Sequence, residues 1–213
     1  MTPSPVSENR HTARRLRTRA QLLDAARAVF AKKGVEAAAI ADITEAADVG
    51  FGSFYNHFAS KEILLEELIG ETIERHGAAL DELTAPLTDA AEVLAVSVRH
   101  TVRMVDQDPV WGGFIVRVGL AHVQLAAGLG HRLRRDLRRG MTEDRFHVPN
   151  LNATQVAVGG LVLATMHSRL LGAVGKDAGD LAAEMILRLL GVSEKEAAQV
   201  SRLPLPPLER NPS

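Results

Sequence analysis

The stretch from Ala39 to Lys61 constrains the fold of this chain more than any other segment. Its second half has Phe54 and Phe58 four residues apart, so both side chains reach one face of a short helix. Residues 48–50 separate the two halves and leave room for a sharp turn alone. The spacing therefore predicts a helix-turn-helix. The first half of the stretch, before this turn, also has apolar residues at helical spacing, which are Ile40, Ile43, Ala46 and Ala47.

The predicted second helix of this motif has exposed positions with side chains able to bond phosphates or base edges. Such a helix can enter the major groove of DNA. Asn56 can pair with adenine through two hydrogen bonds, and Phe51 can contact a thymine methyl group or instead pack on the first helix of the chain, near 18–33. Gly52 leaves room for close approach of the backbone to DNA. Tyr55 and His57 would be ordinary surface residues elsewhere, but in this motif they can bond phosphate.

The run VGFGSFYNHFASKEILL, residues 49–65, resembles the recognition segment of the tetracycline-repressor (TetR) family of bacterial transcription regulators. That family's pattern is Val, a small residue, a variable position, Gly, Thr or Ser, an apolar residue, Tyr-x-His-Phe and a Lys-Glu pair. The resemblance covers residues 17–68, and the remainder matches only in length and helical character. Upstream, the matching positions are Leu22, Ala25, Ala26, Phe30 and Gly34. The DNA-binding residues that we predict are Arg15, Thr44, Gly50, Phe51, Gly52, Ser53, Tyr55, Asn56, His57 and Lys61.

The segment departs from the family pattern at its turn and at its caps. Asp48 stands where the family usually has glycine, and Asp tolerates left-handed backbone better than most residues. Gly50 replaces a capping Ser, and Ala39 replaces a capping Thr or Ser; glycine is an acceptable N-cap. These departures motivate an alternative, in which the chain is a helical ligand- or partner-binding protein whose head no longer reads DNA.

Composition and charge place the chain in a broad class. The 213 residues suit one long domain or two modest ones, and the absence of cysteine excludes disulfides and thiolate metal sites. No signal-peptide pattern precedes the first helix, so we expect a cytoplasmic protein. Residues 1–61 hold nine basic and six acidic side chains, whereas residues 62–213 hold 16 and 20. A modestly basic head on an acidic body suits a protein that presents one end to phosphate.

Four regions follow in chain order. We expect residues 1–17 to be a flexible basic arm, residues 18–59 the helix-turn-helix domain, residues 60–203 a helical effector-binding and dimerisation domain, and residues 204–213 a loose tail. The arginines of the arm either form a solvated tail or contact DNA phosphates or the minor groove. They are Arg10, Arg14, Arg15, Arg17 and Arg19.

The body shows helical periodicity and no strand pattern, so the predicted fold class is all-α: a three-helix DNA-binding head and a helical body. Asn152 is the expected N-cap of the helix near 153–174. The arginine-rich stretch 132–139 is a solvated helix face or, less favoured, a nucleic-acid contact. The helices that we expect span about 18–33, 60–83, 89–106, 111–118, 125–141, 153–174 and 180–190, with a short one after the capping box of Ser193 and Glu196.

The helix near 153–174 is apolar nearly all round and must be covered on every side. His167 and Arg169 interrupt it, so it does not offer the roughly 20 apolar residues of a membrane span. Together with the helix of 180–190 it suits a four-helix seam in a homodimer, and the resemblance implies the same arrangement. The predicted interface residues are Val156, Gly159, Gly160, Leu163, Leu170, Leu181, Met185 and Leu189.

A search for catalytic chemistry finds nothing to support an enzyme. The eight histidines form no HExxH pattern, and no serine lies in GxSxG, so we predict no catalytic residue, metal or cofactor. A body of short helices with glycines and methionines can instead leave a pocket. The candidate lining residues, which could equally fill the core, are His100, Met104, Trp111, Phe114, Arg117, Met166 and His167. Arg117 could meet an anionic head group, and the apolar remainder favours a lipophilic effector.

Together these observations predict a homodimeric, one-component transcriptional regulator that acts as a repressor. Its two heads would fit half-sites about 34 Å apart on a near-palindromic double-stranded operator. A small effector bound in the body would release the DNA, provided that it binds the released form more tightly than the DNA-bound one.

Overall fold

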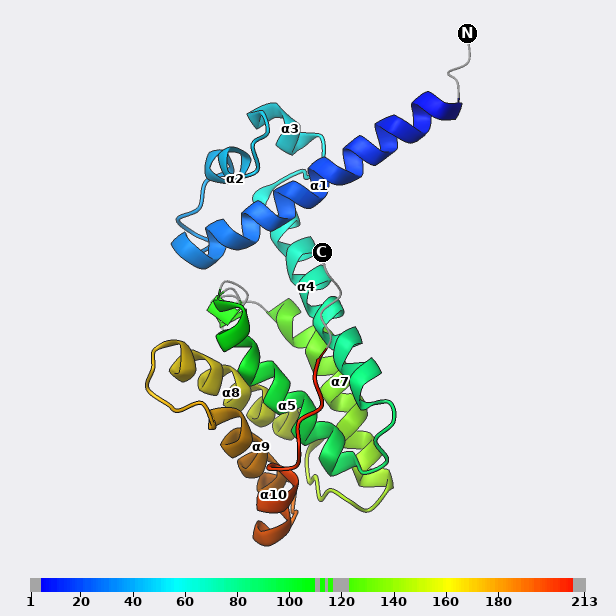
Figure 1. The fold of residues 1–213 in the computed structure, drawn as a ribbon, viewed down its shortest axis with the longest axis vertical. Coiled ribbons are helices and arrows are strands. Elements are labelled where there is room, and N and C mark those ends of the chain that lie inside the picture. The colour runs from blue at the N-terminus through cyan, green and yellow to red at the C-terminus, as the bar shows by residue number, and fades with distance from the viewer. Residues whose placement is uncertain (1–4, 110–111, 114, 117–122, 209–213) are drawn as a thin grey trace. The chain divides into compact units, whose positions relative to one another are not determined.

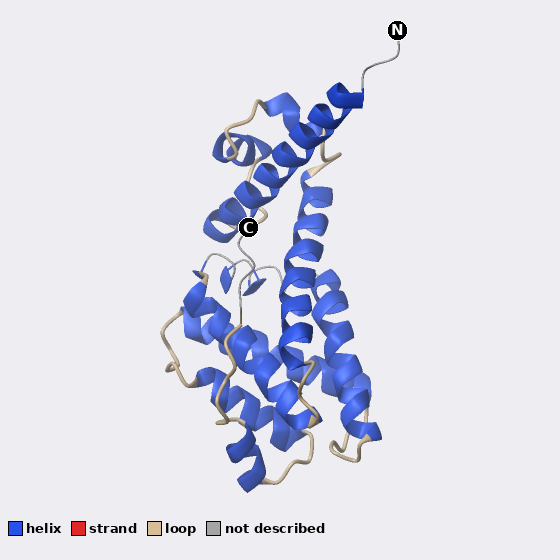
Figure 2. Cartoon of the chain, turned by 45° about the vertical axis from the view of Figure 1, so that its right-hand side comes forward, coloured by secondary structure: helices blue, strands red, loops and turns tan. Residues whose placement is uncertain are grey.

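The protein is all-helical, as the sequence predicts, throughout the part of the chain that its structure describes (Figures 1 and 2). Contacts divide the chain into two compact units, Met1–Ile69 and Gly70–Ser213, and each is described by itself. The computed structural model describes residues 5–109, 112–113, 115–116 and 123–208. No helix in these ranges is both long enough and apolar enough to cross a bilayer.

The first unit contains the predicted helix-turn-helix. Its helices are α1 (Pro5–Lys33), α2 (Ile40–Ala46), α3 (Phe51–Tyr55) and the first turns of α4 (Lys61–Thr84). Phe54 and Phe58 are almost fully buried, as their spacing predicts. Their partners in this core include Leu22, Phe30, Ile43 and Leu64.

Two departures from the family pattern have local compensation. Asp48 has φ of 52°, so it takes the left-handed turn conformation in which glycine is usual. At the start of α2, the Ala39 N–H donates to the Asp42 carboxylate at 2.9 Å, which is the half of a capping box that needs no side chain at position 39. Lys33 also donates to Asp42 at 2.6 Å. The turn therefore forms without glycine, and α2 keeps this half of its cap, although Ala39 has no side chain to accept from the first turn.

The arm expected to be flexible is helical, because α1 begins at Pro5 and continues without a break to Lys33. Proline suits the first turn of a helix, since its missing N–H has no partner there anyway. Residues 8–17 include glutamate, alanine, leucine and several arginines, which are good helix formers. Extending an existing helix adds one hydrogen bond for each residue fixed, so no new nucleus is needed.

The second unit is built around α5 (Ala90–Gln107), which is buried along most of its length. It packs against α7 (Val123–Thr142), α8 (Leu151–Leu170) and α9 (Ala178–Leu189), as Figure 1 shows. The later turns of α4 and α10 (Glu194–Val200) complete the described part of this unit. The Ser193 hydroxyl accepts from the Glu196 N–H, as the capping box predicts.

One predicted helix cap is wrong, and one predicted helix lies partly outside the described residues. Asn150, and not Asn152, caps α8, because its side-chain oxygen accepts from the Ala153 N–H at 3.0 Å. The side chain of Asn152 instead accepts a hydrogen bond from Arg134 at 2.7 Å. Half of the helix expected at 111–118 lies outside the described residues.

The tail is held against α5 rather than loose, at least through residue 206. The Arg99 guanidinium donates to the Leu203 carbonyl at 2.7 Å, and the His100 Nε2 bonds the Pro206 carbonyl at 2.9 Å. A proline-rich segment outside any helix keeps its carbonyl oxygens available as acceptors. The buried Arg99 and His100 use two of them.

Candidate nucleic-acid interface and ligand cavity

The helix α3 presents two exposed aromatic side chains. Phe51 and Tyr55 are each 54% exposed, and their ring centroids lie 5.9 Å apart in an edge-to-face arrangement. Beneath them Phe54 is fully buried, with its centroid 5.3 Å from that of Tyr55. A helix of five residues thus has one aromatic side chain in the core and two outside. Large exposed aromatic side chains at one place are typical of a binding surface.

The backbone of α3 is open to an approaching molecule. A Cβ atom added at Gly50 or Gly52 would meet no atom within 4 Å. Asn56, at the C-terminal end of α3, is exposed, and Ser53 is half-buried. Gly50, Gly52 and Asn56 are therefore accessible, and Ser53 is partly so.

His57 follows α3 and is partly enclosed. Burial, and then the nearby positive charges of Arg15 and Arg19, lower the pKa of His57. Its Nδ1 atom is buried and has no hydrogen-bond partner among the residues that the structure describes. The imidazole is therefore neutral at pH 7, and it can offer a phosphate an N–H but no positive charge.

Two further residues predicted to bind DNA have contacts within the head. Lys61 donates to the carbonyl oxygens of Val35 and Ala38, at 2.9 and 3.0 Å, so it ties the start of α4 to the loop before α2. An ammonium group has three N–H donors, so one remains for a phosphate. Thr44 is only 4% exposed, and its hydroxyl donates to the Ala41 carbonyl, which removes it from the accessible surface.

A cavity of about 370 Å³ lies within the second unit, between α4, α5, α7 and α8. Its lining is mainly apolar. Polar side chains gather at the side where α4 and α7 meet, and Thr101 adds a hydroxyl from α5. Apolar residues that line it include Leu80, Leu94, Val98, Leu133 and Met166. The polar ones include Asp81, Thr101, Arg132, Asp136 and Gln155.

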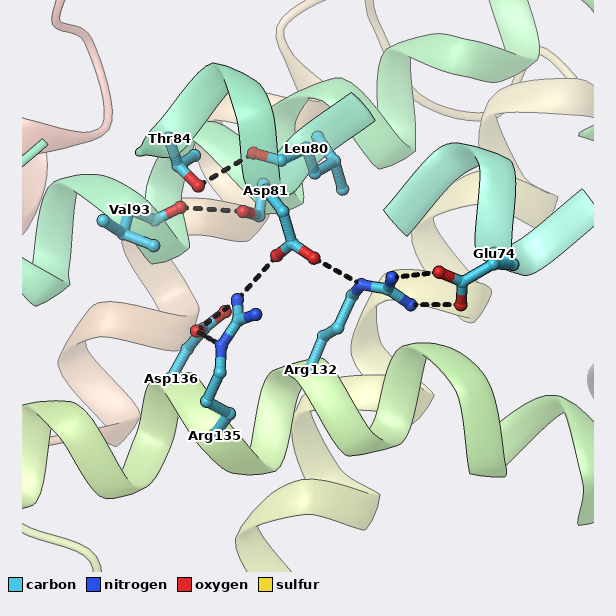
Figure 3. Close-up of polar contacts among 9 residues, drawn as sticks. Glu74, Leu80, Asp81, Thr84, Val93, Arg132, Arg135 and Asp136 are labelled. Atoms are coloured by element: carbon cyan, nitrogen blue, oxygen red, sulfur yellow. Dashed lines mark hydrogen bonds and ion pairs between the residues drawn. The ribbon is translucent and has the colours of Figure 1, made fainter. Parts of the chain in front are cut away.

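Ion pairs between α4 and α7 organise the polar side of the cavity (Figure 3). Arg132 donates to Asp81 at 2.8 Å and to both oxygens of Glu74, at 2.8 and 3.1 Å. Arg135 donates to Asp81 at 2.7 Å and to Asp136 at 2.8 Å. The two arginines that engage these acids belong to the stretch expected to be a solvated helix face. They instead join α7 to α4.

The two carboxyl groups of this network that line the cavity, those of Asp81 and Asp136, have opposite pKa shifts. Burial raises the pKa of Asp136, and the hydrogen bond from Arg135 only partly offsets that effect. Burial also opposes ionisation of Asp81, but hydrogen bonds from Arg135 and Arg132 outweigh it and lower the pKa of Asp81. The cavity therefore has a firmly ionised carboxylate beside one that takes up a proton more readily.

Of the residues expected to line a pocket, the structure places Met166 in the cavity wall. His100 bonds the tail, His167 is exposed, and Met104 is half-buried outside the lining. The side chains of Trp111, Phe114 and Arg117 lie outside the described residues. Sequence reasoning missed Asp81 and Arg132. Acids on one helix and arginines at helical spacing on another were the available signal.

An apolar surface runs along the residues expected to form a dimer interface. Val156 on α8 is 75% exposed, and on α9 Leu181, Met185 and Leu189 are 43%, 51% and 53% exposed. Gly160 is exposed, while Gly159, Leu163 and Leu170 are half-buried. We call this set of exposed residues, Val156, Gly160, Leu181, Met185 and Leu189, the α8–α9 face.

A helix-turn-helix unit followed by a helical unit with a cavity defines the class of one-component regulators. Family comparison agrees: residues 22–68 match the model described as bacterial regulatory proteins, tetR family, and residues 89–202 match the tetracyclin repressor-like C-terminal domain. The chain belongs to the TetR family.

Named relatives and solved structures agree with this assignment. The chain is similar to the HTH-type transcriptional repressor KstR2 of Rhodococcus jostii, with 31% identity over 106 residues, 50% of each chain. The chain spans about half the length of such curated relatives. It is also similar to RolR in complex with resorcinol, with 38% identity, a TM-score of 0.76 and coverage of 93% of this chain and 100% of that one. RolR without ligand gives 37% identity, a TM-score of 0.74 and coverage of 89% and 100%.

Proposed function

We propose that this protein is a DNA-binding transcriptional repressor whose α3 reads an operator in the major groove. The exposed aromatic pair Phe51 and Tyr55, beside the open backbone of Gly52, carries this proposal. Relatives named transcriptional repressors support it. We assign DNA reading to residues 18–59, and effector binding and dimerisation to residues 60–203. The contact residues are Arg15, Gly50, Phe51, Gly52, Ser53, Tyr55, Asn56, His57 and Lys61.

The repressor acts as a homodimer through the α8–α9 face. Burying exposed leucine, methionine and valine side chains against a second copy stabilises the pair by about 25 cal/mol for each Å² of apolar surface removed from water. A twofold axis then presents two α3 helices to half-sites about 34 Å apart. Gly159, Leu163 and Leu170 complete the interface at its edge.

The effector is a small, mainly apolar molecule with hydroxyl groups. A cavity of about 370 Å³ holds a small ligand, and its apolar walls favour a ring or hydrocarbon body. At the polar side, the carboxylates of Asp81 and Asp136 can accept hydrogen bonds from hydroxyl groups, and Arg132 can donate one. The similar protein RolR binds resorcinol, a benzene ring with two hydroxyl groups, which supports this class of ligand.

The helix α4 connects the two activities within one chain. It begins with Lys61, which bonds the loop before α2, and it contributes Asp81 to the cavity. An effector that rearranges the bonds of Asp81 changes the position that α4 prefers. DNA is released only if the effector binds the released form more tightly than the DNA-bound form.

Fluorescence anisotropy with the DNA upstream of the protein's own gene tests this function. We expect sequence-selective binding that weakens steeply between 50 and 200 mM salt, as it does for proteins that contact about six to ten phosphates. Resorcinol should reduce the affinity. Binding that is weak and equal on scrambled DNA would contradict the proposal and favour a ligand-binding protein whose head no longer reads DNA.

A further inference from the structure

The cavity and the α8–α9 face share residues. Val156, Gly159, Gly160 and Leu163 all line the cavity, yet Val156 is 75% exposed and Gly160 is also exposed. One side of each of these residues therefore faces the cavity, and the other faces the surroundings. Here α8 forms a wall of the cavity that is itself accessible from outside, and we therefore place the mouth of the cavity along Val156 and Gly160.

The outer side of this part of α8 has few polar groups that water could solvate. Residues 151–166 of α8 contain no charged side chain, and among the described residues of α8 only Val158 and Met166 are buried. Val156, Gly160 and Ala164 recur every four residues and are all exposed, so they lie along one stripe of the helix. An uncharged, exposed stripe next to a cavity mouth requires a cover.

A second copy of this chain can provide this cover. Leu181, Met185 and Leu189 also recur every four residues, so α9 adds a parallel apolar stripe to that of α8. Two such helices from each copy pair with themselves about a twofold axis, since each surface is its own complement. Added Cβ atoms at Gly159 and Gly160 would meet nothing within 4 Å, so a partner helix can approach the backbone closely at the mouth.

We infer that the effector site is complete only in the dimer, where α8 of a second copy closes the mouth of the cavity along Val156 and Gly160. This inference rests on the proposed dimeric regulator and specifies how its ligand site is built. The bound effector then touches, or is enclosed by, both copies.

Closure by the partner links effector binding to dimer formation. Each dimer has two such sites, so a ligand that binds each site more tightly in the dimer than in the monomer must strengthen the dimer by the square of that factor. The effector therefore releases DNA by changing the shape of an intact dimer. It does not release DNA by separating the two copies.

Thiol labelling tests closure without any effector, because the chain contains no cysteine. Ser97 lines the cavity from α5, so the Ser97→Cys variant carries a single thiol inside it. N-ethylmaleimide should label this thiol about tenfold faster when Met185→Asp on α9 breaks the dimer. The matched control is Met141→Asp, a second exposed methionine on α7 that lies outside both the cavity lining and the α8–α9 face.

Dilution of the Ser97→Cys chain provides the same test if Met185→Asp does not fold. Sedimentation gives the fraction of monomer, and the labelling rate should rise with that fraction. A labelling rate that stays constant while the dimer dissociates would overturn the inference but would not contradict the proposed dimer. A chain that sediments as a monomer at every concentration would overturn both.

Resorcinol is the probe for the linked binding. Met185→Asp should bind resorcinol about tenfold more weakly than Met141→Asp. Because each dimer has two sites, saturating resorcinol should lower the dimer dissociation constant about a hundredfold. A folded, monomeric Met185→Asp that binds resorcinol as tightly as the control would overturn the inference. If no variant binds resorcinol, the proposed effector class is wrong, and the labelling result alone decides whether the cavity is closed in the dimer.

Discussion

The two candidate sites of this protein differ in how the chain builds them. Apart from Arg15 and Lys61, the surface that we assign to DNA comes from residues 50–57, a single turn and one short helix over a buried phenylalanine. The cavity comes from four helices whose lining residues extend from Leu80 to Met166. The first site depends on local spacing, whereas the second depends on how distant helices pack. Substitutions should therefore affect the two sites in different ways.

The sharpest contrast lies between adjacent residues of α3. Phe54→Ala removes a fully buried ring, so it should destabilise the first unit by about 3–5 kcal/mol. Tyr55→Ala removes an exposed ring and should change stability by about 0.5 kcal/mol or less. Tyr55→Ala should nevertheless weaken DNA binding. Thermal unfolding and anisotropy of both variants measure these effects, and equal unfolding curves would contradict the packing described for α3.

Gly52→Ala separates folding from DNA binding. The added methyl group has free space in the protein, and alanine favours a helix by about 1 kcal/mol over glycine, so stability should rise slightly. The same methyl group would obstruct close approach to DNA and reduce affinity by about a hundredfold, or about 2.7 kcal/mol. Gly70→Ala is the control, since its methyl group also has free space but lies on α4. Equal DNA affinity in the two variants would remove Gly52 from the interface.

Stability should fall in mild acid because of a buried histidine in the second unit. Burial, with smaller contributions from His100 and Arg132, lowers the pKa of His76 to about 4, and its Nε2 atom lies 3.0 Å from the Thr101 hydroxyl. The unfolded chain binds the proton near pH 6.5 and the folded chain near pH 4, so stability is full above pH 6.5 and decreases between these values. From pH 7 to pH 5 the loss should be about 2 kcal/mol.

Urea unfolding at pH 7 and pH 5 measures this loss in the natural protein and in His76→Asn. The other histidines are present in both proteins, so the difference between the two pH responses isolates His76. Asparagine has no proton to gain, and its variant should show the smaller response. Identical pH responses would show that His76 titrates normally in the folded protein.

Arg132→Met tests the polar side of the cavity with the smallest expected effect. Methionine keeps the length of the side chain but donates no hydrogen bond, so resorcinol binding should weaken about tenfold. Arg138→Met is the matched control, because Arg138 is exposed on α7 and absent from the lining. Calorimetry measures both. Unchanged binding in Arg132→Met would place the hydroxyl contacts elsewhere.

The sequence predicted the first unit well because its signals are local. Phe54 and Phe58 share a helical face, and the turn at Asp48 needs a residue that accepts the left-handed conformation. The same reasoning failed for Thr44, whose burial depends on how α2 packs against its neighbours.

In the second unit, local sequence patterns predict the helices but not how they pack. The helices of this unit could be predicted from their periodicity, but the partner of each side chain could not. The Arg99 bond to Leu203 joins residues 104 apart, and the Arg132 bond to Asp81 joins residues 51 apart. No spacing rule links positions so distant, so the residues that line the cavity and the contacts that hold the tail could not be predicted from the sequence.

A hydroxyl-radical footprint on DNA selected from a random library tests the central claim most directly. The account predicts two protected patches centred about 34 Å apart, on a sequence with approximate twofold symmetry. Asn56→Ala should keep the spacing of the patches while losing selectivity at one base position in each half-site. A single uninterrupted patch, or protection that is indifferent to DNA sequence, would contradict the assignment of α3 as the reading helix.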